Sequence, residues 1–169
     1  MTAHVHVRVA DPADLERVGE LTVGAYLSDD LLDPGHWYVD ELRDAGRRAE
    51  SATVLVAVED DRVIGTVTLA AAGSPFAEIA QAQEFEVRML AVDPAARGRG
   101  IGELLMRAAI DRAIGWGAHA VVLTTLPEMA AAQRLYERMG LRRTPERDWT
   151  GESGRTFLTY LADAPEGAR

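Results

Sequence analysis

The residues from Val92 to Gly102 (VDPAARGRGIG) combine glycines and arginines in an order that suits the binding of an anion. An apolar strand pattern precedes them, Pro94 marks a turn, and a helical pattern follows. A helix that begins there directs the unpaired amide groups of its first turn, and the positive end of its dipole, toward one point. The glycines allow close approach to the backbone, and Arg97 and Arg99 add positive charge. We therefore expect a phosphate group to bind at this segment.

Two familiar phosphate-binding loops do not fit this segment. A P-loop places lysine and then serine or threonine after its last glycine, and the chain contains no lysine. A dinucleotide-binding fold needs G-x-G-x-x-G and an acidic residue at the end of the next strand. Here the glycines are spaced G-x-G-x-G, and the next predicted strand ends in Leu-Thr-Thr (123–125). The predicted phosphate site is therefore of another kind.

The segment resembles the acetyl-CoA motif of the GNAT superfamily of N-acetyltransferases, Gln/Arg-x-x-Gly-x-Gly/Ala, through Arg97, Gly100 and Gly102. The resemblance covers residues 85 to 141, and the first 84 residues only through the order of elements. The preceding strand resembles the family pattern E-x-x-x-L-x-V-x-P through Glu86, Leu90, Val92 and Pro94. A later helix resembles A-x-x-x-Y-x-x-x-G-F through Ala132, Tyr136 and Gly140. The chain departs from the family at Leu141, usually aromatic, and at Met129, often asparagine.

The resemblance implies acetyl-CoA as co-substrate and no metal. It assigns the pantetheine arm to free backbone groups near Leu90, Ala91 and Val92, beside a splay between two central strands. It assigns the pyrophosphate to the amides of the turn, namely Arg97, Gly98, Arg99, Gly100, Ile101 and Gly102. Independently of the resemblance, His4 and His6 alternate on a predicted strand without a cluster of carboxylates, so the sequence predicts no metal site.

Two residues match family positions that move protons during acyl transfer. Glu86 lies four residues before Leu90 on the predicted strand and matches a position often used as the base that takes the amine proton, directly or through water. The alternative is a surface carboxylate beside Glu84. Tyr136 matches the usual donor to the departing thiolate. Its alternative is a core tyrosine that packs with Ala132 and its helical neighbours.

The acceptor side of the chain carries a strong negative charge. Residues 1–86 hold 17 acids and 6 arginines, a net −11, whereas residues 87–169 hold 10 acids and 12 arginines, a net +2. An acidic cleft concentrates cations. We therefore expect the acceptor to be a small-molecule amine that carries positive charge beyond its reacting group. The alternative is that these acids only form a solvated surface. The region where the family varies its acceptor site holds the candidate substrate-binding residues Tyr26, Asp29, Asp30 and Trp37. The alternatives are a protein N-terminal or lysine acetyltransferase and a non-catalytic acyl-CoA sensor.

Length and composition limit the classes of protein to which the chain can belong. The 169 residues suit one domain, 1–169. The absence of cysteine excludes disulfides and a catalytic thiol and fits a reducing compartment. A net charge of −9 argues against nucleic-acid binding. The first residues lack a charged and then apolar export signal and no apolar run suits a bilayer, so we expect a cytoplasmic protein. Members of the family often dimerise, which leaves a homodimer open.

The elements that must position these residues follow from hydrophobic periodicity and turn chemistry. Helices are predicted after Asp11-Pro12 and at 36–49, 102–115 and 129–140. Strands are predicted at 4–9, 53–59, 62–71, 85–93, 119–125, 141–145 and 155–162, with a turn at Asp60-Asp61 and a loop at 73–83. This order predicts an α+β domain with a mixed sheet covered by helices on both faces. The resemblance implies a mostly antiparallel sheet of about seven strands.

Overall fold

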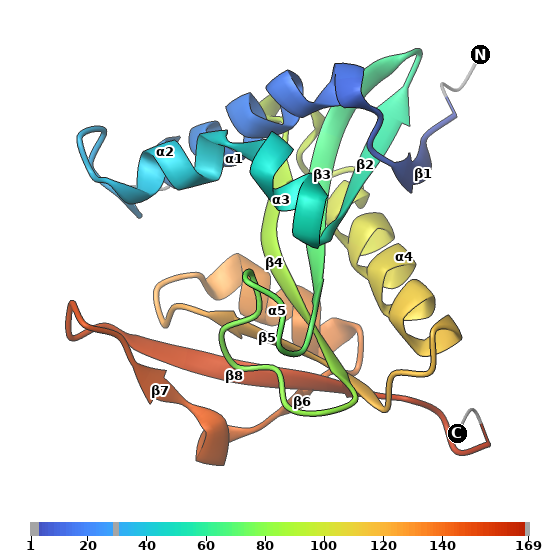
Figure 1. Cartoon of the computed structure of the whole chain (residues 1–169), viewed down its shortest axis with the longest axis vertical. Coiled ribbons are helices and arrows are strands. Elements are labelled where there is room, and N and C mark those ends of the chain that lie inside the picture. Colours follow the sequence, from blue (N-terminus) through green and yellow to red (C-terminus); the bar gives the residue numbers. More distant parts are fainter. Residues whose placement is uncertain (1–3, 29–30, 168–169) are drawn as a thin grey trace.

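The computed structural model describes residues 4–28 and 31–167 as one mixed sheet with helices on both faces (Figure 1). Neighbouring strands follow the order β1-β2-β3-β4-β5-β8-β6, and β7 pairs with β8. Only β4 and β5 pair in parallel, and the other pairs are antiparallel. The strands are β1 (His6–Val9), β2 (Thr53–Glu59), β3 (Arg62–Ala71), β4 (Glu84–Val92), β5 (Ala120–Thr125), β6 (Arg142–Arg143), β7 (Trp149–Thr150) and β8 (Thr156–Asp163). The predicted fold class is confirmed.

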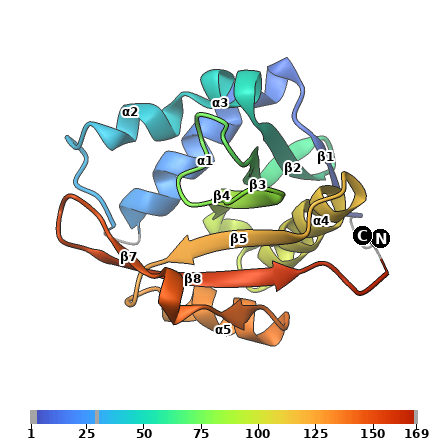
Figure 2. The same ribbon diagram turned by 60° about the horizontal axis from the view of Figure 1, so that its bottom comes forward.

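Five α-helices cover the described part of the sheet, three on one face and two on the other (Figure 2). One face carries α1 (Leu15–Ser28), α2 (Tyr38–Arg43) and α3 (Ala45–Ser51). The other face carries α4 (Ile101–Gly115) and α5 (Ala130–Arg138). Short 3₁₀ turns lie at Pro12–Asp14, Pro94–Ala96 and Pro145–Arg147. None of the described helices is long and apolar enough to cross a bilayer.

Each face of the sheet has its own apolar core. Leu55, Leu69 and Leu105 belong to the core under α4 and α5. Val18 and Val56 belong to the core under α1 and α3. β2 and β3 bury side chains on both faces, and their sequences are largely apolar for that reason. β4 is also largely buried, but it carries Glu84, Glu86 and Arg88.

The hairpin of β2 and β3 turns as its sequence predicts. Asp60 and Asp61 both have positive φ angles, 47° and 62°. This is the backbone of a two-residue turn whose twist matches that of the flanking strands, and aspartate tolerates it better than most residues. The prediction of this hairpin is confirmed.

The predicted helix at 36–49 is wrong in one respect, because the structure divides it into α2 and α3. Asp44 leaves the helical conformation with φ −82° and ψ 69°. Its carboxylate accepts a hydrogen bond from the Arg47 amide at 3.0 Å and so begins a new helix. Aspartate competes for backbone amides in this way, which helical periodicity does not register.

A glycine allows the end of α2 to approach α1. A Cβ atom on Gly19 would lie 2.3 Å from the carbonyl oxygen of Arg43. No real side chain tolerates that distance, so Gly19 sets the closeness of the two helices. The position of α2, and with it the acceptor side, depends on this contact.

Candidate active site

The parallel strands β4 and β5 pair over a short stretch and then separate. Their register joins Glu84 with Ala120, Phe85 with Val121 and Glu86 with Val122, and it ends there. Beyond Glu86, β4 has no pairing to β5 while it still pairs with β3 as far as Val92. On the side that faces β5, the backbone of β4 therefore has hydrogen-bonding groups that pair with no strand. This separation of the two strands is the predicted splay.

A β-bulge in β4 changes which side chains face which core. Met89 has a positive φ angle of 56°, and the register to β3 shifts between Thr66 and Thr68. Met89 packs in the core below α2, while Val87 and Leu90 both pack in the core below α4. Strict alternation, which places Val87 opposite Leu90, is therefore wrong at this point, because a bulge inserts one residue and flips the pattern.

The predicted phosphate-binding turn follows β4 directly. The 3₁₀ turn Pro94–Ala96 leads into exposed residues 97–100, and α4 begins at Ile101. Gly98 and Gly100 have φ angles of 77° and 79°, and a Cβ on either would meet no atom within 4 Å. These glycines supply a left-handed backbone that leaves the space in front of the helix open. The predicted order of strand, turn and helix is confirmed.

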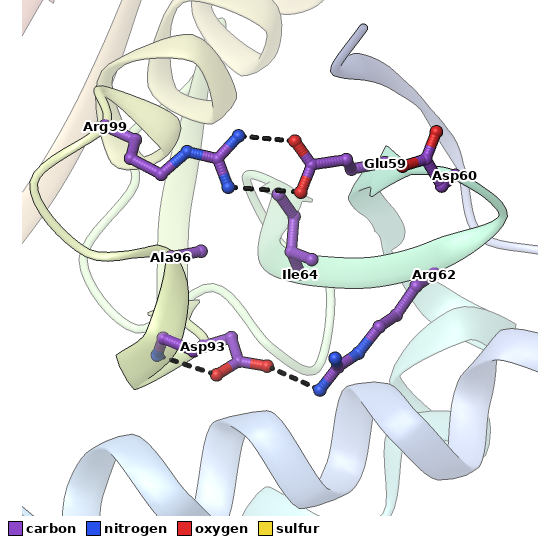
Figure 3. A pocket seen from close by; sticks show the side chains of 8 residues that line it. Glu59, Asp60, Arg62, Ile64, Asp93, Ala96 and Arg99 are labelled. Atoms are coloured by element: carbon purple, nitrogen blue, oxygen red, sulfur yellow. Dashed lines mark hydrogen bonds and ion pairs between the residues drawn. The ribbon is translucent and has the colours of Figure 1, made fainter. Parts of the chain in front are cut away.

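The two arginines of this turn have partners inside the protein. Arg99 pairs with the carboxylate of Glu59 at the end of β2, with Nη1 at 3.1 Å from Oε2. Arg97 extends to Ser28 at the end of α1, where Nη2 donates to Oγ at 3.4 Å. The Arg99 pair lines a pocket of about 260 Å³ behind the turn, together with Asp93 and Arg62 (Figure 3). Because their side chains are held in this way, we expect the amides to provide the main anion contact.

Glu86 lies at the point where the splay begins and is 3% exposed. Both carboxylate oxygens accept backbone hydrogen bonds from the loop between β3 and β4, from the amides of Glu78 and Ile79 at 2.7 Å each. Burial raises the pKa of Glu86, and these two amides and Arg88 oppose the rise. A buried carboxylate with a raised pKa is a better proton acceptor than a solvated one.

Tyr136 lies on α5 in the core beside the splay and is 6% exposed. Its ring lies 5.6 Å from that of Tyr160, centroid to centroid. Among the described residues we find no hydrogen-bond partner for its hydroxyl. Burial raises the pKa of Tyr136, and Tyr26 and Tyr160 raise it further. The phenol therefore keeps its proton at neutral pH, as a donor must.

Tyr26 lies on α1, on the opposite face of the sheet from Tyr136, and yet it contributes to the raised pKa of Tyr136. No pairing joins β4 and β5 beyond Glu86, so the sheet is open between its two faces at this point. Of the two predicted acceptor residues that the structure describes, Tyr26 and Trp37, Tyr26 is the one whose charge affects the pKa of Tyr136.

Two polar residues, Tyr38 and Arg88, lie beside Tyr26; Tyr38 belongs to the same predicted acceptor region, whereas Arg88 is not predicted from the sequence. The Tyr38 ring contacts Tyr26 edge-on at 6.2 Å. Arg88 on β4 donates to the Tyr38 hydroxyl at 2.7 Å and to the Phe76 carbonyl at 3.0 Å. An arginine two residues after Glu86 on the same strand face was a usable signal, but the partner lies 50 residues away in the sequence.

Trp37 lies on the outer surface, where its ring meets that of Tyr38 at 5.5 Å between centroids. It is 72% exposed and lines a pocket of about 300 Å³ with Asp40, Glu41, Asp44, Arg47 and Phe76. Asp29 and Asp30, the other two acceptor candidates, lie outside the described residues. Three acidic residues, Asp40, Glu41 and Asp44, therefore lie together at this outer pocket.

The fold and the site define the class of the protein. The model of the acetyltransferase (GNAT) family matches residues 18–141, and the chain belongs to this family. Acetyl-CoA is the co-substrate of GNAT enzymes, and one solved GNAT-fold structure contains it. No group of residues that could hold a metal ion is found in the described part of the chain.

Individual curated N-acetyltransferases are similar to this chain over part of their length. Mycothiol acetyltransferase of Mycobacteroides abscessus is 44% identical over 55 residues, 32% of this chain and 19% of that protein. N-alpha-acetyltransferase RimI of Mycobacterium tuberculosis is 42% identical over 62 residues, 36% of this chain and 39% of that protein. The matched segments thus span less than half of these relatives.

A solved structure extends the similarity to nearly the whole chain. The acetyltransferase yncA of Salmonella typhimurium, solved with acetyl-CoA, superimposes with a TM-score of 0.71 at 24% identity, over 98% of this chain and 96% of that one. The residues of this chain fit the same co-substrate, because β4 offers unpaired backbone beyond Glu86 and the turn before Ile101 is open to an anion.

Proposed function

We propose that this chain is an N-acetyltransferase that moves the acetyl group directly from acetyl-CoA to an amine of a small molecule. The observation that carries the proposal is the opening between β4 and β5, which begins at Glu86 and has Tyr136 beside it. Acetyl-CoA supplies an activated acetyl group as a thioester. The backbone of Leu90, Ala91 and Val92 would hold its pantetheine arm, and the amides of residues 97–102 its pyrophosphate.

Glu86 would remove the proton from the attacking amine. An alkyl amine with a pKa of about 10.4 is neutral in about one molecule in 2,500 at pH 7, a deficit of roughly 4.6 kcal/mol. A carboxylate that burial makes more basic recovers part of this deficit, directly or through one water. The two amide hydrogen bonds at 2.7 Å hold Glu86 in one orientation, so it is ready to accept a proton at a fixed place.

Tyr136 would donate a proton to the thiolate that leaves. The thiolate has a pKa near 8.5, so it leaves more readily if a donor protonates it. Tyr136 is buried, retains its proton and has no other hydrogen bond among the described residues to break first. Glu86 and Tyr136 together argue against a non-catalytic acyl-CoA sensor, which needs neither.

We expect the acceptor to be cationic beyond its reacting amine. The outer pocket beside Trp37 is lined by three carboxylates and one arginine, which attracts cations to the acceptor side. The positive charges of Arg48, which is buried, and of Arg88, whose side chain is 14% exposed, weaken this preference for cations deeper in the molecule. A protein acceptor is the second candidate, since RimI of Mycobacterium tuberculosis, with 42% identity over 62 residues, is an N-alpha-acetyltransferase.

The test is turnover on a matched acceptor panel with product mass as the readout. The panel holds diamines, monoamines, amino acids and short peptides with free N-termini, each at low and high salt. The proposal expects N-acetylated diamines as the best product, with kcat/KM falling as salt screens the acidic surface. Preferred peptides would favour the protein-acceptor alternative, preferred amino acids would overturn the cationic preference, and no product on any amine would overturn N-acetyltransfer itself.

A further inference from the structure

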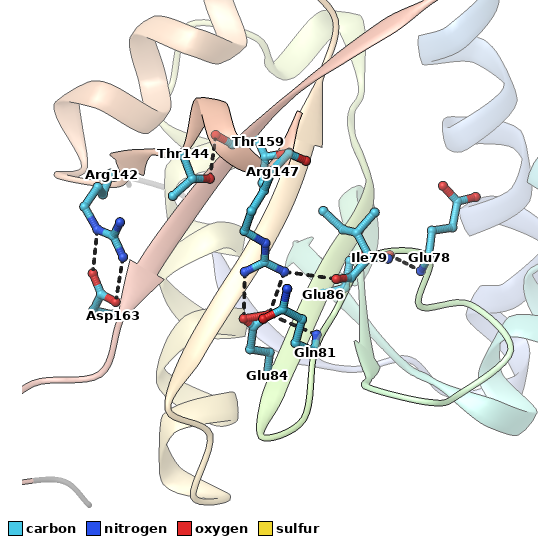
Figure 4. A network of polar contacts seen from close by, with 10 residues as sticks. All are labelled: Glu78, Ile79, Gln81, Glu84, Glu86, Arg142, Thr144, Arg147, Thr159 and Asp163. Atoms are coloured by element: carbon cyan, nitrogen blue, oxygen red, sulfur yellow. Dashed lines mark hydrogen bonds and ion pairs between the residues drawn. The ribbon is translucent and has the colours of Figure 1, made fainter. Parts of the chain in front are cut away.

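The loop between β3 and β4 is held by two carboxylates of β4 and one arginine from a distant part of the chain (Figure 4). The carboxylate of Glu86 accepts hydrogen bonds from the backbone amides of Glu78 and Ile79. Two residues earlier on the same strand, Glu84 accepts the amide of Gln81 at 3.0 Å. These three hydrogen bonds fix the backbone of the loop against the strand face that carries the proposed base.

Arg147 completes this arrangement from the 3₁₀ turn Pro145–Arg147. Its guanidinium donates to both oxygens of Glu84 at 2.8 Å each and to the carbonyl oxygen of Ile79 at 3.0 Å. The side chains of Arg147 and Glu84 are 17% and 10% exposed. The backbone of Arg147 is itself held, because its carbonyl accepts the Thr159 hydroxyl of β8 at 3.0 Å.

Ile79 is therefore held on both sides of its backbone. Its carbonyl accepts from Arg147, and its amide donates to Glu86 Oε1. Its side chain packs on the apolar cluster of Ala120, Val122 and Leu161. A residue fixed in this way transmits the position of Arg147 to the carboxylate of Glu86 without any direct contact between the two side chains.

We propose that Arg147 is a positioning residue, which orients the carboxylate of Glu86 at the splay by holding the backbone of Ile79. The proposal rests on the proposed function, in which Glu86 is the base. A bidentate arginine suits this role because its planar group serves Glu84 and the Ile79 carbonyl at once, whereas a lysine presents one ammonium group.

The charged groups that face Glu86 come from three elements. Glu84 and Arg88 lie on β4, Glu78 lies on the loop, and Arg147 lies on the 3₁₀ turn. The amides, Arg88 and Arg147 favour the ionised carboxylate, while burial and Glu78 oppose it. Loss of Arg147 removes a cation and loosens the Ile79 amide, and both changes favour the protonated form. The pKa of Glu86 should therefore rise when Arg147 is replaced.

The experiment follows Glu86 in Arg147→Gln by two readouts. The first is the pH dependence of kcat on an accepted amine, and the second is the pH titration of the Glu86 carboxyl by carbon-13 NMR, assigned with Glu86→Gln. We expect kcat to fall about 10- to 100-fold, both midpoints to move to higher pH, and acetyl-CoA affinity to stay within about twofold. Wild-type kcat and an unmoved titration in the folded variant would overturn the proposal.

Two further variants keep the test decisive. Arg142→Gln removes a nearby arginine whose partner is the exposed Asp163, and it should change neither readout. If Arg147→Gln does not fold, Arg147→Lys keeps the charge but not the three hydrogen bonds, and wild-type kcat in that variant would overturn the proposal. If Glu86→Gln keeps wild-type kcat, the proposed base fails instead. The NMR titration would then still decide whether Arg147 positions Glu86.

Discussion

The co-substrate side and the acceptor side of this molecule are built in different ways. On the co-substrate side, β4, the glycine turn and α4 are consecutive in sequence, and the proposed binding groups belong to the backbone. On the acceptor side, contacts join residues far apart, such as Arg88 with Tyr38 over 50 positions and Arg147 with Glu84 over 63. A backbone site is thus encoded locally, whereas a side-chain site depends on packing between distant elements.

The largest effect should come from a charge placed in the backbone site. Gly100→Glu adds a carboxylate where the pyrophosphate of acetyl-CoA is expected, at a glycine with φ 79°. Repulsion and bulk should weaken acetyl-CoA binding by about 100-fold or more, measured by calorimetry. Gly117→Glu is the control, because Gly117 has a similar φ of 92° and equally open space but lies past the far end of α4. Equal affinity in both variants would place the pyrophosphate elsewhere.

An effect on chemistry alone, with acetyl-CoA binding unchanged, is expected at α5. Tyr136→Phe removes a hydroxyl without a hydrogen-bond partner among the described residues, so thermal stability should hold. Turnover should fall about 10- to 1,000-fold if this hydroxyl donates the proton. Tyr160→Phe is the control, since its ring lies 5.6 Å away and its hydroxyl contacts Glu137 instead. Steady-state kinetics measure the turnover of both variants. Wild-type turnover by Tyr136→Phe would show that Tyr136 serves only in packing.

The dependence of the acceptor side on packing can be tested at one glycine. Gly19→Ala forces a Cβ against the Arg43 carbonyl, where the distance would be 2.3 Å. We expect the free energy of unfolding to fall by about 1–3 kcal/mol. Gly24→Ala lies on the same helix with no atom within 4 Å of its Cβ, and it should stabilise by about 0.5–1 kcal/mol. Chemical denaturation measures both, and an unaffected Gly19→Ala would show that α2 can move away without cost.

The smallest effect concerns the pair behind the glycine turn. Glu59→Gln removes the carboxylate that holds Arg99, so the guanidinium becomes available to an anion. Acetyl-CoA affinity should rise by about two- to fivefold at low salt and lose this gain at high salt. Asp61→Asn on the same hairpin removes one charge without touching the pair. Calorimetry that finds the same change in both variants would attribute the effect to net charge.

Much of the fold, and the backbone that forms the candidate co-substrate site, could be predicted from the sequence. The hairpin at Asp60 and Asp61, the sheet and the glycine turn follow from local periodicity and turn chemistry. The break at Asp44 and the bulge at Met89 could not, because each depends on a hydrogen bond or a register shift that periodicity does not encode. The contacts of Arg88 and Arg147 also could not, since their partners meet only in the folded chain.

The central claim, direct transfer to an amine, is tested most directly by following the label during turnover. The enzyme is mixed with carbon-13 acetyl-CoA and an accepted amine, and samples are quenched at successive times. Mass spectrometry then measures the mass of the intact protein and of the product in each sample. The chain has no cysteine and no lysine, so no thiol or side-chain amine is present to carry the acetyl group. We predict that the label appears on the product nitrogen while the protein gains at most one acetyl, at its amino terminus. A protein that carries one labelled acetyl per active site during turnover, and loses it as product forms, would contradict direct transfer.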